Sequence, residues 1–135
     1  QPDIDLETLS IVDRVQLSSS ADTLLAMRWI AILRGSTGIS LAATGGVHTA
    51  EDALKMLLAG ADVVHIASAL LKRGPQLLGE ILTDIARWLE EREYVSVAQL
   101  KGSRSQQNSP SPSVFARAAY LHVLDSFSPP AGVRY

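Results

Sequence analysis

A glycine pair between two short apolar runs constrains the fold of this chain more than any other feature. The first run, Ile39 to Thr44, ends directly in Gly45-Gly46, and the second covers Asp62 to Ala67. Short apolar runs bounded by glycine are typical of strands buried on both faces of a parallel sheet. The residues between the runs have helical spacing, so the sequence predicts a βαβ unit with a right-handed crossover.

The ends of these two predicted strands form a candidate anion site. A strand that closes in Gly-Gly and opens a helix brings backbone N–H groups close to a ligand, and phosphate is the usual ligand at such a turn. Neighbouring parallel strands end at the same edge, so one anion could be bound by both turns. The expected binding residues are Thr44, Gly45, Gly46, Ala67 and Ser68. The alternative is a tight turn that needs glycine for backbone reasons only, with Thr44 as an ordinary strand residue.

The flanking segments are mainly helical in pattern. Residues 1–17 are expected to be a surface connection with one short strand, followed by a helix over about 21–33 after three serines. Thr49 and Asp52 predict a capping box for the central helix. A long helix follows Gly74-Pro75, and a short one starts at Ser96. Residues 103–113 are expected to be a flexible loop, residues 114–127 a C-terminal helix and residues 128–135 a loose tail.

Two phosphate-binding turns on adjacent strands are the arrangement expected of the last two units of a (β/α)8 barrel. A closed barrel needs about 250 residues, whereas this chain has 135 and begins at Gln1. The sequence therefore predicts an α/β fold that is a C-terminal fragment of a TIM barrel. Residues 1–102 would be its last two βα units with the helices that follow, and missing strands would cover the sheet edge.

Composition excludes several kinds of function. The net charge of −2 provides no basic field for nucleic acid or an anionic membrane. The absence of cysteine excludes disulfides, thiolate zinc sites and a thiol nucleophile within these residues. The three histidines lack metal-ligand spacing, so no metal site is predicted. The most apolar stretch, Met56 to Leu71, contains Asp62 and His65 and is not a membrane span. We expect a cytoplasmic protein.

Several motifs in order resemble the C-terminal part of the dihydroorotate dehydrogenase family. They extend over about residues 43–102, and the agreement covers both order and spacing. The motifs are Ala43-Thr44-Gly45-Gly46-Val47, Leu58-Ala59-Gly60-Ala61, Val64-His65-Ile66-Ala67-Ser68-Ala69-Leu70, Gly74-Pro75 and Leu100-Lys101-Gly102. The resemblance implies a (β/α)8 barrel with FMN at its mouth. It also implies an oxidoreductase acting on a CH–CH group, which oxidises dihydroorotate to orotate in pyrimidine biosynthesis.

Carried over by position, the resemblance implies that Gly45 and Gly46 present N–H groups to the FMN phosphate. Ala67 and Ser68 would do so after the next strand, where the family usually has Gly-Thr. Ala67 keeps the N–H but adds a methyl group, and Ser68 keeps a hydroxyl. The family's catalytic base lies on a loop after an earlier strand, so no catalytic residue is assigned. We expect the fragment alone to be inactive.

Two other interpretations stay open. The chain could belong to a flavin-free phosphate-binding barrel, such as a lyase or synthase acting on a small phosphorylated substrate. It could also be a non-catalytic truncated half-barrel that self-associates through its open sheet edges. In every case the expected partner is a small molecule or a second copy of the chain.

Overall fold

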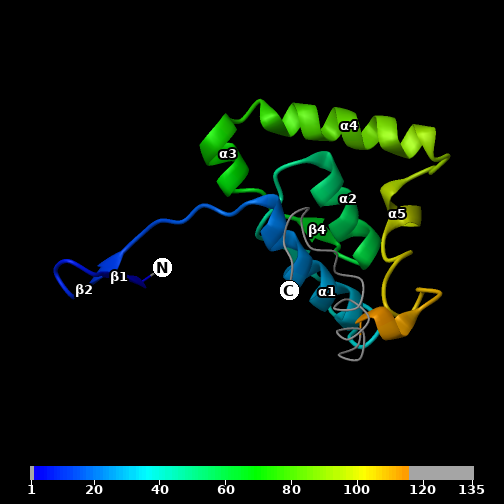
Figure 1. Ribbon diagram of the computed structural model, residues 1–135. Helices are drawn as coiled ribbons and strands as arrows, with labels where there is room; N and C mark the ends of the chain where they lie inside the picture. The colour runs from blue at the N-terminus through cyan, green and yellow to red at the C-terminus, as the bar shows by residue number, and fades with distance from the viewer. Residues whose placement is uncertain (1, 116–135) are drawn as a thin grey trace, which may run out of the picture.

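The computed structural model describes residues 2–115 (Figure 1). In chain order the elements are β1 (Pro2–Asp5), β2 (Ser10–Asp13), η1 (Ser20–Asp22), α1 (Thr23–Leu33), β3 (Ala42–Ala43), α2 (Ala50–Ala59), β4 (Val63–Val64), α3 (Ser68–Arg73), α4 (Leu77–Glu91), α5 (Val97–Leu100) and η2 (Pro112–Phe115). The content of helices and parallel strands confirms the α/β class. The expected helix over 114–127 lies mostly, and the tail over 128–135 wholly, outside the described residues.

The predicted βαβ unit is present, and its strands are parallel. β3 pairs with β4 in the register Ala42 to Val63 and Ala43 to Val64, with α2 as the crossover. The strands are shorter than the predicted runs. One further backbone hydrogen bond follows the pairing at its end, from His65 N–H to the Ala43 carbonyl at 2.8 Å. The runs are shortened because each strand has only one neighbour among residues 2–115.

Local chemistry sets the limits of α2. The Thr49 hydroxyl accepts the Asp52 N–H at 3.2 Å, and the Asp52 carboxylate accepts the Thr49 N–H at 3.1 Å. This is the capping box that the sequence predicts, and it satisfies backbone donors of the first turn. The helix ends at Gly60, whose φ of 128° is accessible at little cost only to glycine.

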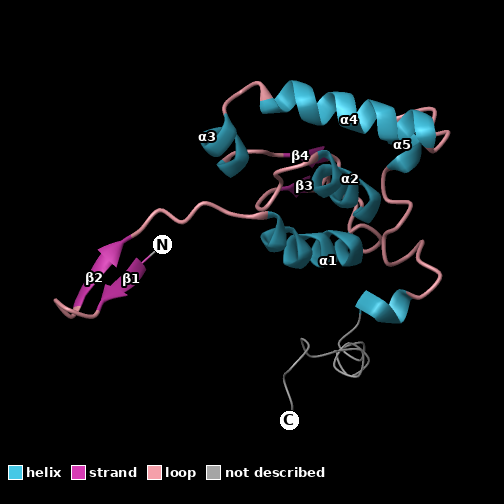
Figure 2. Cartoon of the chain, turned by 45° about the horizontal axis from the view of Figure 1, so that its top comes forward, coloured by secondary structure: helices cyan, strands magenta, loops and turns pink. Residues whose placement is uncertain are grey.

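The core lies between the helices and the short sheet. Figure 2 shows α4 and α1 on opposite sides of the layer that holds α2, β3 and β4. Helix α2 carries more buried apolar side chains than any other described element, because its residues face both neighbouring helices. The buried residues of the largest cluster are Ile30, Ala31, Leu41, Ala43, Val47, Ala53, Met56, Ala59 and Ala61.

Residues 2–13 differ from the expected single strand, because they form an antiparallel hairpin of β1 and β2. The turn between them holds Leu9 at a positive φ of 52°, and the Asp5 carboxylate accepts the N–H groups of Glu7 and Thr8. The hairpin extends away from the helices (Figure 1). No local pattern predicts this turn, because a leucine occupies the position that glycine or asparagine usually takes.

The segment after α5 runs back along the molecule. The N–H of Gly102 donates to the Leu57 carbonyl, that of Arg104 to Leu58 and that of Gln106 to Ala31, at 2.9 to 3.0 Å. The residues expected to form a flexible loop are therefore tied by backbone hydrogen bonds to α1 and α2. Within residues 2–115, no helix has the length and hydropathy needed to cross a bilayer.

Candidate functional site

The two turns named as the candidate anion site follow β3 and β4 and lie at the same edge of the sheet, because the strands are parallel. Gly45 and Gly46 have φ of +87° and +80°, which side chains rarely adopt. Thr44, Gly45 and Ala67 are exposed, Ser68 is half-buried and Gly46 is buried. The structure thus brings all five predicted residues to one edge.

The two glycines have different surroundings. A Cβ atom on Gly46 would lie 2.5 Å from the Thr23 nitrogen and 2.8 Å from the Ser19 carbonyl oxygen, so the backbone before α1 closes over this residue. A Cβ on Gly45 would meet no atom within 4 Å. Glycine is therefore needed at position 46 for packing, whereas position 45 faces open space where a ligand can approach.

Ser18 joins the two turns. The Gly46 N–H donates to the Ser18 hydroxyl at 3.2 Å, and the Ser18 N–H donates to the Ser68 hydroxyl at 3.2 Å. One residue from the segment before α1 thus contacts the turn after β3 and the turn after β4. The two turns and the Ser18 backbone together form a small cradle, which we call the strand-end cradle.

The strand-end cradle offers free donors. The backbone N–H groups of Gly45, Ala67 and Ser68 have no acceptor among residues 2–115. Clustered N–H groups beside positive-φ glycines are suited to an anion, because each donates a hydrogen bond without any side-chain charge. The open space at Gly45 leaves room for it.

Two basic side chains contact Ser18 at different atoms. The Lys72 ammonium donates to the Ser18 carbonyl at 2.8 Å, and the His48 Nε2 lies 3.4 Å from the Ser18 hydroxyl. Asp22 lies near both, and its carboxylate accepts the Ser19 N–H at 2.7 Å. That hydrogen bond is the main cause of the lowered pKa of Asp22, with smaller contributions from the two basic residues.

Asp52 fixes the position of the segment that carries Ser18. Its carboxylate accepts the Ser20 hydroxyl at 2.7 Å and the His48 N–H at 3.0 Å. Burial acts to raise the pKa of this carboxyl, but the hydrogen bonds, with the Ser20 hydroxyl first, outweigh burial and leave the pKa below its usual value. A charged, satisfied Asp52 therefore connects the start of α2 to the residues before α1.

The opposite edge of the sheet carries a charged cluster of a different kind. Asp62, just before β4, accepts the Lys101 ammonium at 2.6 Å and the Arg34 guanidinium at 3.0 Å, and also the Leu41 N–H at 2.9 Å. The Lys101 contact, followed by the Leu41 N–H, holds the pKa of Asp62 well below its usual range. Polar contacts at the amino-terminal edge of parallel strands usually serve stability.

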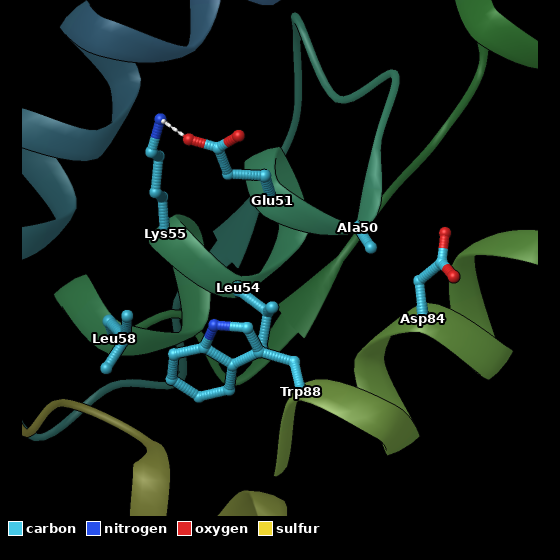
Figure 3. Close-up of a pocket in the computed structure, with 7 residues that line it drawn as sticks. All are labelled: Ala50, Glu51, Leu54, Lys55, Leu58, Asp84 and Trp88. Atoms are coloured by element: carbon cyan, nitrogen blue, oxygen red, sulfur yellow. Dashed lines mark ion pairs between the residues drawn. The ribbon is translucent and has the colours of Figure 1, made fainter. Parts of the chain in front are cut away.

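A separate cavity of about 420 Å³ opens between α2 and α4 (Figure 3). Its lining residues are Ala50, Glu51, Leu54, Lys55, Leu58, Asp84 and Trp88. The floor is apolar, and the ion pair between Lys55 and Glu51 at 2.6 Å lies at its rim. None of the five predicted site residues contributes to this cavity. Within residues 2–115, no group of three acidic or histidine side chains could hold a metal ion.

Lys72 follows the second predicted turn, and a surface role is the favoured prediction for it, with long-range help to an anion as the alternative. Sequence reasoning missed Ser18, which is predicted only as a helix cap, because its contacts join positions 28 and 50 residues apart. No local pattern carries such information. Conversely, His65 lies within the second predicted strand, where packing against a neighbouring helix is expected, but it is exposed.

These features define an α/β protein in which two parallel strands end in adjacent turns, the first of them bearing a glycine pair. A solved structure with this fold is the ligand-free dihydroorotate dehydrogenase of Eimeria tenella, with a TM-score of 0.59, 22% identity and coverage of 63% of this chain. The sequence model of the dihydroorotate dehydrogenase family matches residues 4–89. The chain belongs to the dihydroorotate dehydrogenase family.

Curated relatives agree with this membership. The catalytic subunit of the NAD(+)-type dihydroorotate dehydrogenase B of Pyrococcus abyssi is 37% identical over 58% of this chain. The quinone-type enzyme of Deinococcus radiodurans is 42% identical over 47% of it, and the fumarate-type enzyme A of Lactococcus lactis is 34% identical over 47%. The chain spans only 26%, 17% and 21% of these relatives' lengths, and 24% of the Eimeria tenella chain.

Proposed function

We propose that this chain supplies the cofactor-phosphate end of an FMN-dependent dihydroorotate dehydrogenase, which oxidises dihydroorotate to orotate. The observation that carries the proposal is the convergence of free N–H groups from two adjacent strand ends. Family membership supports the same interpretation, because the motif that ends β3 lies within residues 4–89.

In this proposal the strand-end cradle holds the phosphate of FMN. Gly45, Ala67 and Ser68 donate their N–H groups, and the Ser68 hydroxyl adds a polar contact. The open space beside Gly45 leaves room for the phosphate, whereas a side chain at this position would fill that space. The flavin supplies the hydride chemistry when bound, while these residues fix its phosphate and so its orientation. No residue of this chain is assigned as the catalytic base.

We further propose that β3, α2, β4 and α4 are the last two βα units of a (β/α)8 barrel. Each strand has one neighbour among residues 2–115, and Val63 on β4 is 49% exposed although its type favours burial. In a closed barrel the remaining strands cover both open edges and these side chains.

The test of the cofactor proposal compares FMN with riboflavin, which has the same ring but lacks the phosphate. We expect FMN to bind more tightly, by fluorescence titration of the purified protein. Gly45→Val places a branched side chain in the strand-end cradle and should lower FMN affinity at least about tenfold while leaving riboflavin affinity unchanged. Gly74→Val is the matched control, because Gly74 has nearly the same φ of +86° and so the same backbone strain, but it follows α3 and lies in neither strand-end turn.

Equal affinity for FMN and riboflavin would contradict the proposal. Binding of a sugar phosphate without any flavin would replace it with the flavin-free barrel, since the same N–H groups can hold any phosphate monoester.

The self-associating half-barrel is favoured by one observation. Large apolar side chains are exposed on both flanks of the sheet, on α1 and on α3 and α4: Leu24, Leu25, Trp29, Leu71 and Leu82. We propose that a second copy covers these side chains when the chain is alone, because exposed apolar area on this scale drives association. Sedimentation of the purified chain should then show a dimer or larger species, and a stable monomer at high concentration would contradict it.

A further inference from the structure

Two adjacent basic residues at the end of α3, Lys72 and Arg73, contact different partners. The Lys72 ammonium reaches back 54 residues to the Ser18 carbonyl at 2.8 Å. Arg73, the next residue, pairs with Glu80 on α4 at 2.6 Å. Both side chains are exposed and carry the same charge, so they differ mainly in what they hold. Of these two residues, only Lys72 contacts Ser18, which joins the two strand-end turns.

We infer that Lys72 is a positioning residue that latches the Ser18 backbone across the strand-end cradle and thereby favours ligands carrying a phosphate. The identity of the ligand in this inference rests on the proposed function. The effect of Lys72 on the position of Ser18 does not depend on that function. Lys72 lies outside the five residues expected to bind the cofactor.

The latch acts through three atoms of one residue. Lys72 holds the Ser18 carbonyl, while the Ser18 N–H and hydroxyl contact Ser68 and Gly46. These groups share one short stretch of backbone, so fixing the carbonyl also fixes the direction of the N–H and the hydroxyl. Without the ammonium, the Ser18 carbonyl loses the hydrogen bond that Lys72 donates, and the hydrogen bonds of Ser18 to both turns weaken together.

The charge of Lys72 also matters at this place. The strand-end cradle itself offers only neutral N–H groups, and the nearby carboxylates accept other donors: Asp22 accepts the Ser19 N–H, and Asp52 accepts the Ser20 hydroxyl. The His48 Nε2 lies 3.4 Å from the Ser18 hydroxyl. An ammonium group beside neutral donors attracts a dianion more strongly than a neutral ligand. The latch should therefore increase selectivity for FMN over riboflavin.

The first measurement needs no ligand. Amide hydrogen exchange, followed by NMR on the purified protein, reports the protection of the Ser18 and Gly46 N–H groups. Lys72→Gln should reduce both protection factors at least about fivefold, since the hydrogen bonds become free to open. Arg73→Gln removes the same charge from the neighbouring position and should leave both unchanged, and Lys72→Arg should restore most of the protection. Unchanged protection in Lys72→Gln would overturn the latch.

The second measurement is the ratio of FMN to riboflavin affinity. Lys72→Gln should lower FMN affinity about tenfold and leave riboflavin affinity unchanged, because the nearby positive charge and the fixed position of Ser18 act only on the phosphate. Arg73→Gln should change neither. If Lys72→Gln and Arg73→Gln weaken FMN binding equally, general electrostatic attraction replaces the latch. If the unaltered protein does not prefer FMN, the proposed function fails, whereas the exchange result still decides the structural part.

Discussion

The Lys101 ammonium lies 2.6 Å from the carboxylate of Asp62, so the segment after α5 is bound to the start of β4. The same carboxylate accepts the Arg34 guanidinium from the residue that ends α1. One acidic side chain thus joins three parts of the chain at the edge of the sheet opposite the strand-end cradle.

Asp62→Asn should make the protein less stable at neutral pH and flatten its loss of stability in acid. The folded protein holds the pKa of Asp62 below its usual value. The carboxylate therefore contributes stability above the unfolded pKa of about 4, and this contribution is lost as the pH falls below that value. Urea unfolding midpoints at pH 7, 4 and 3 measure the effect. Asp84→Asn, in an exposed pair with Arg87, is the control and should change the midpoint little.

Asp52→Ala should destabilise the protein by about 2 kcal/mol, because it removes a helix cap and leaves buried donors unpaired. The Asp52 side chain is 5% exposed and accepts the Ser20 hydroxyl as well as two backbone N–H groups. Glu51→Ala removes the same charge from the preceding, exposed position and should cost less than about 0.5 kcal/mol. If chemical denaturation shows equal losses in the free energy of unfolding for the two variants, the capping box does not contribute to stability as proposed.

Gly46→Ala should destabilise the protein by about 2 kcal/mol more than Gly45→Ala. Both glycines have nearly the same positive φ, so the backbone strain is common to the two variants. Only at position 46 does the new methyl group meet backbone atoms, at 2.5 Å from the Thr23 nitrogen. Thermal unfolding of both variants separates packing from strain, and similar melting temperatures would contradict the close approach of the η1 backbone to this turn.

Leu100→Ala should cost about 2–5 kcal/mol. Leu100 is 0% exposed and packs with Leu54 and Leu57 of α2, so its loss opens a cavity beneath α5. Val95→Ala is the control on the same side of the molecule, because Val95 is 90% exposed and should tolerate the change. Equal free energies of unfolding for the two variants would mean that the segment after α4 is not part of the folded core.

The sequence predicted the elements whose signals are local. Thr49 and Asp52 lie three residues apart, and their side chains define the start of α2 with no help from the rest of the chain. Gly45 and Gly46 marked the end of β3 because their backbone conformation is available to few other residues. Parallel pairing followed from the crossover helix, which leaves little topological choice.

The remainder depends on contacts between distant positions. Ser18 has no sequence neighbour that indicates its role, because its partners Gly46 and Ser68 lie 28 and 50 residues away. The hairpin of β1 and β2 was expected as a single strand, because Leu9 occupies a turn position without the usual glycine or asparagine. Residues 103–113 have a loop-like composition, yet the Gln106 N–H donates to the Ala31 carbonyl.

Because Ser18 bridges the two strand ends, ligand binding at the strand-end cradle is coupled to folding. A βαβ unit on its own contains both strand ends but lacks the hydroxyl and amide that span them. The free donors of Gly45, Ala67 and Ser68 are therefore held in place by Ser18 only in molecules whose first helix has already docked. An anion that recognises the completed arrangement would shift the equilibrium toward docked molecules, and the resulting rise in melting temperature would grow with ligand concentration.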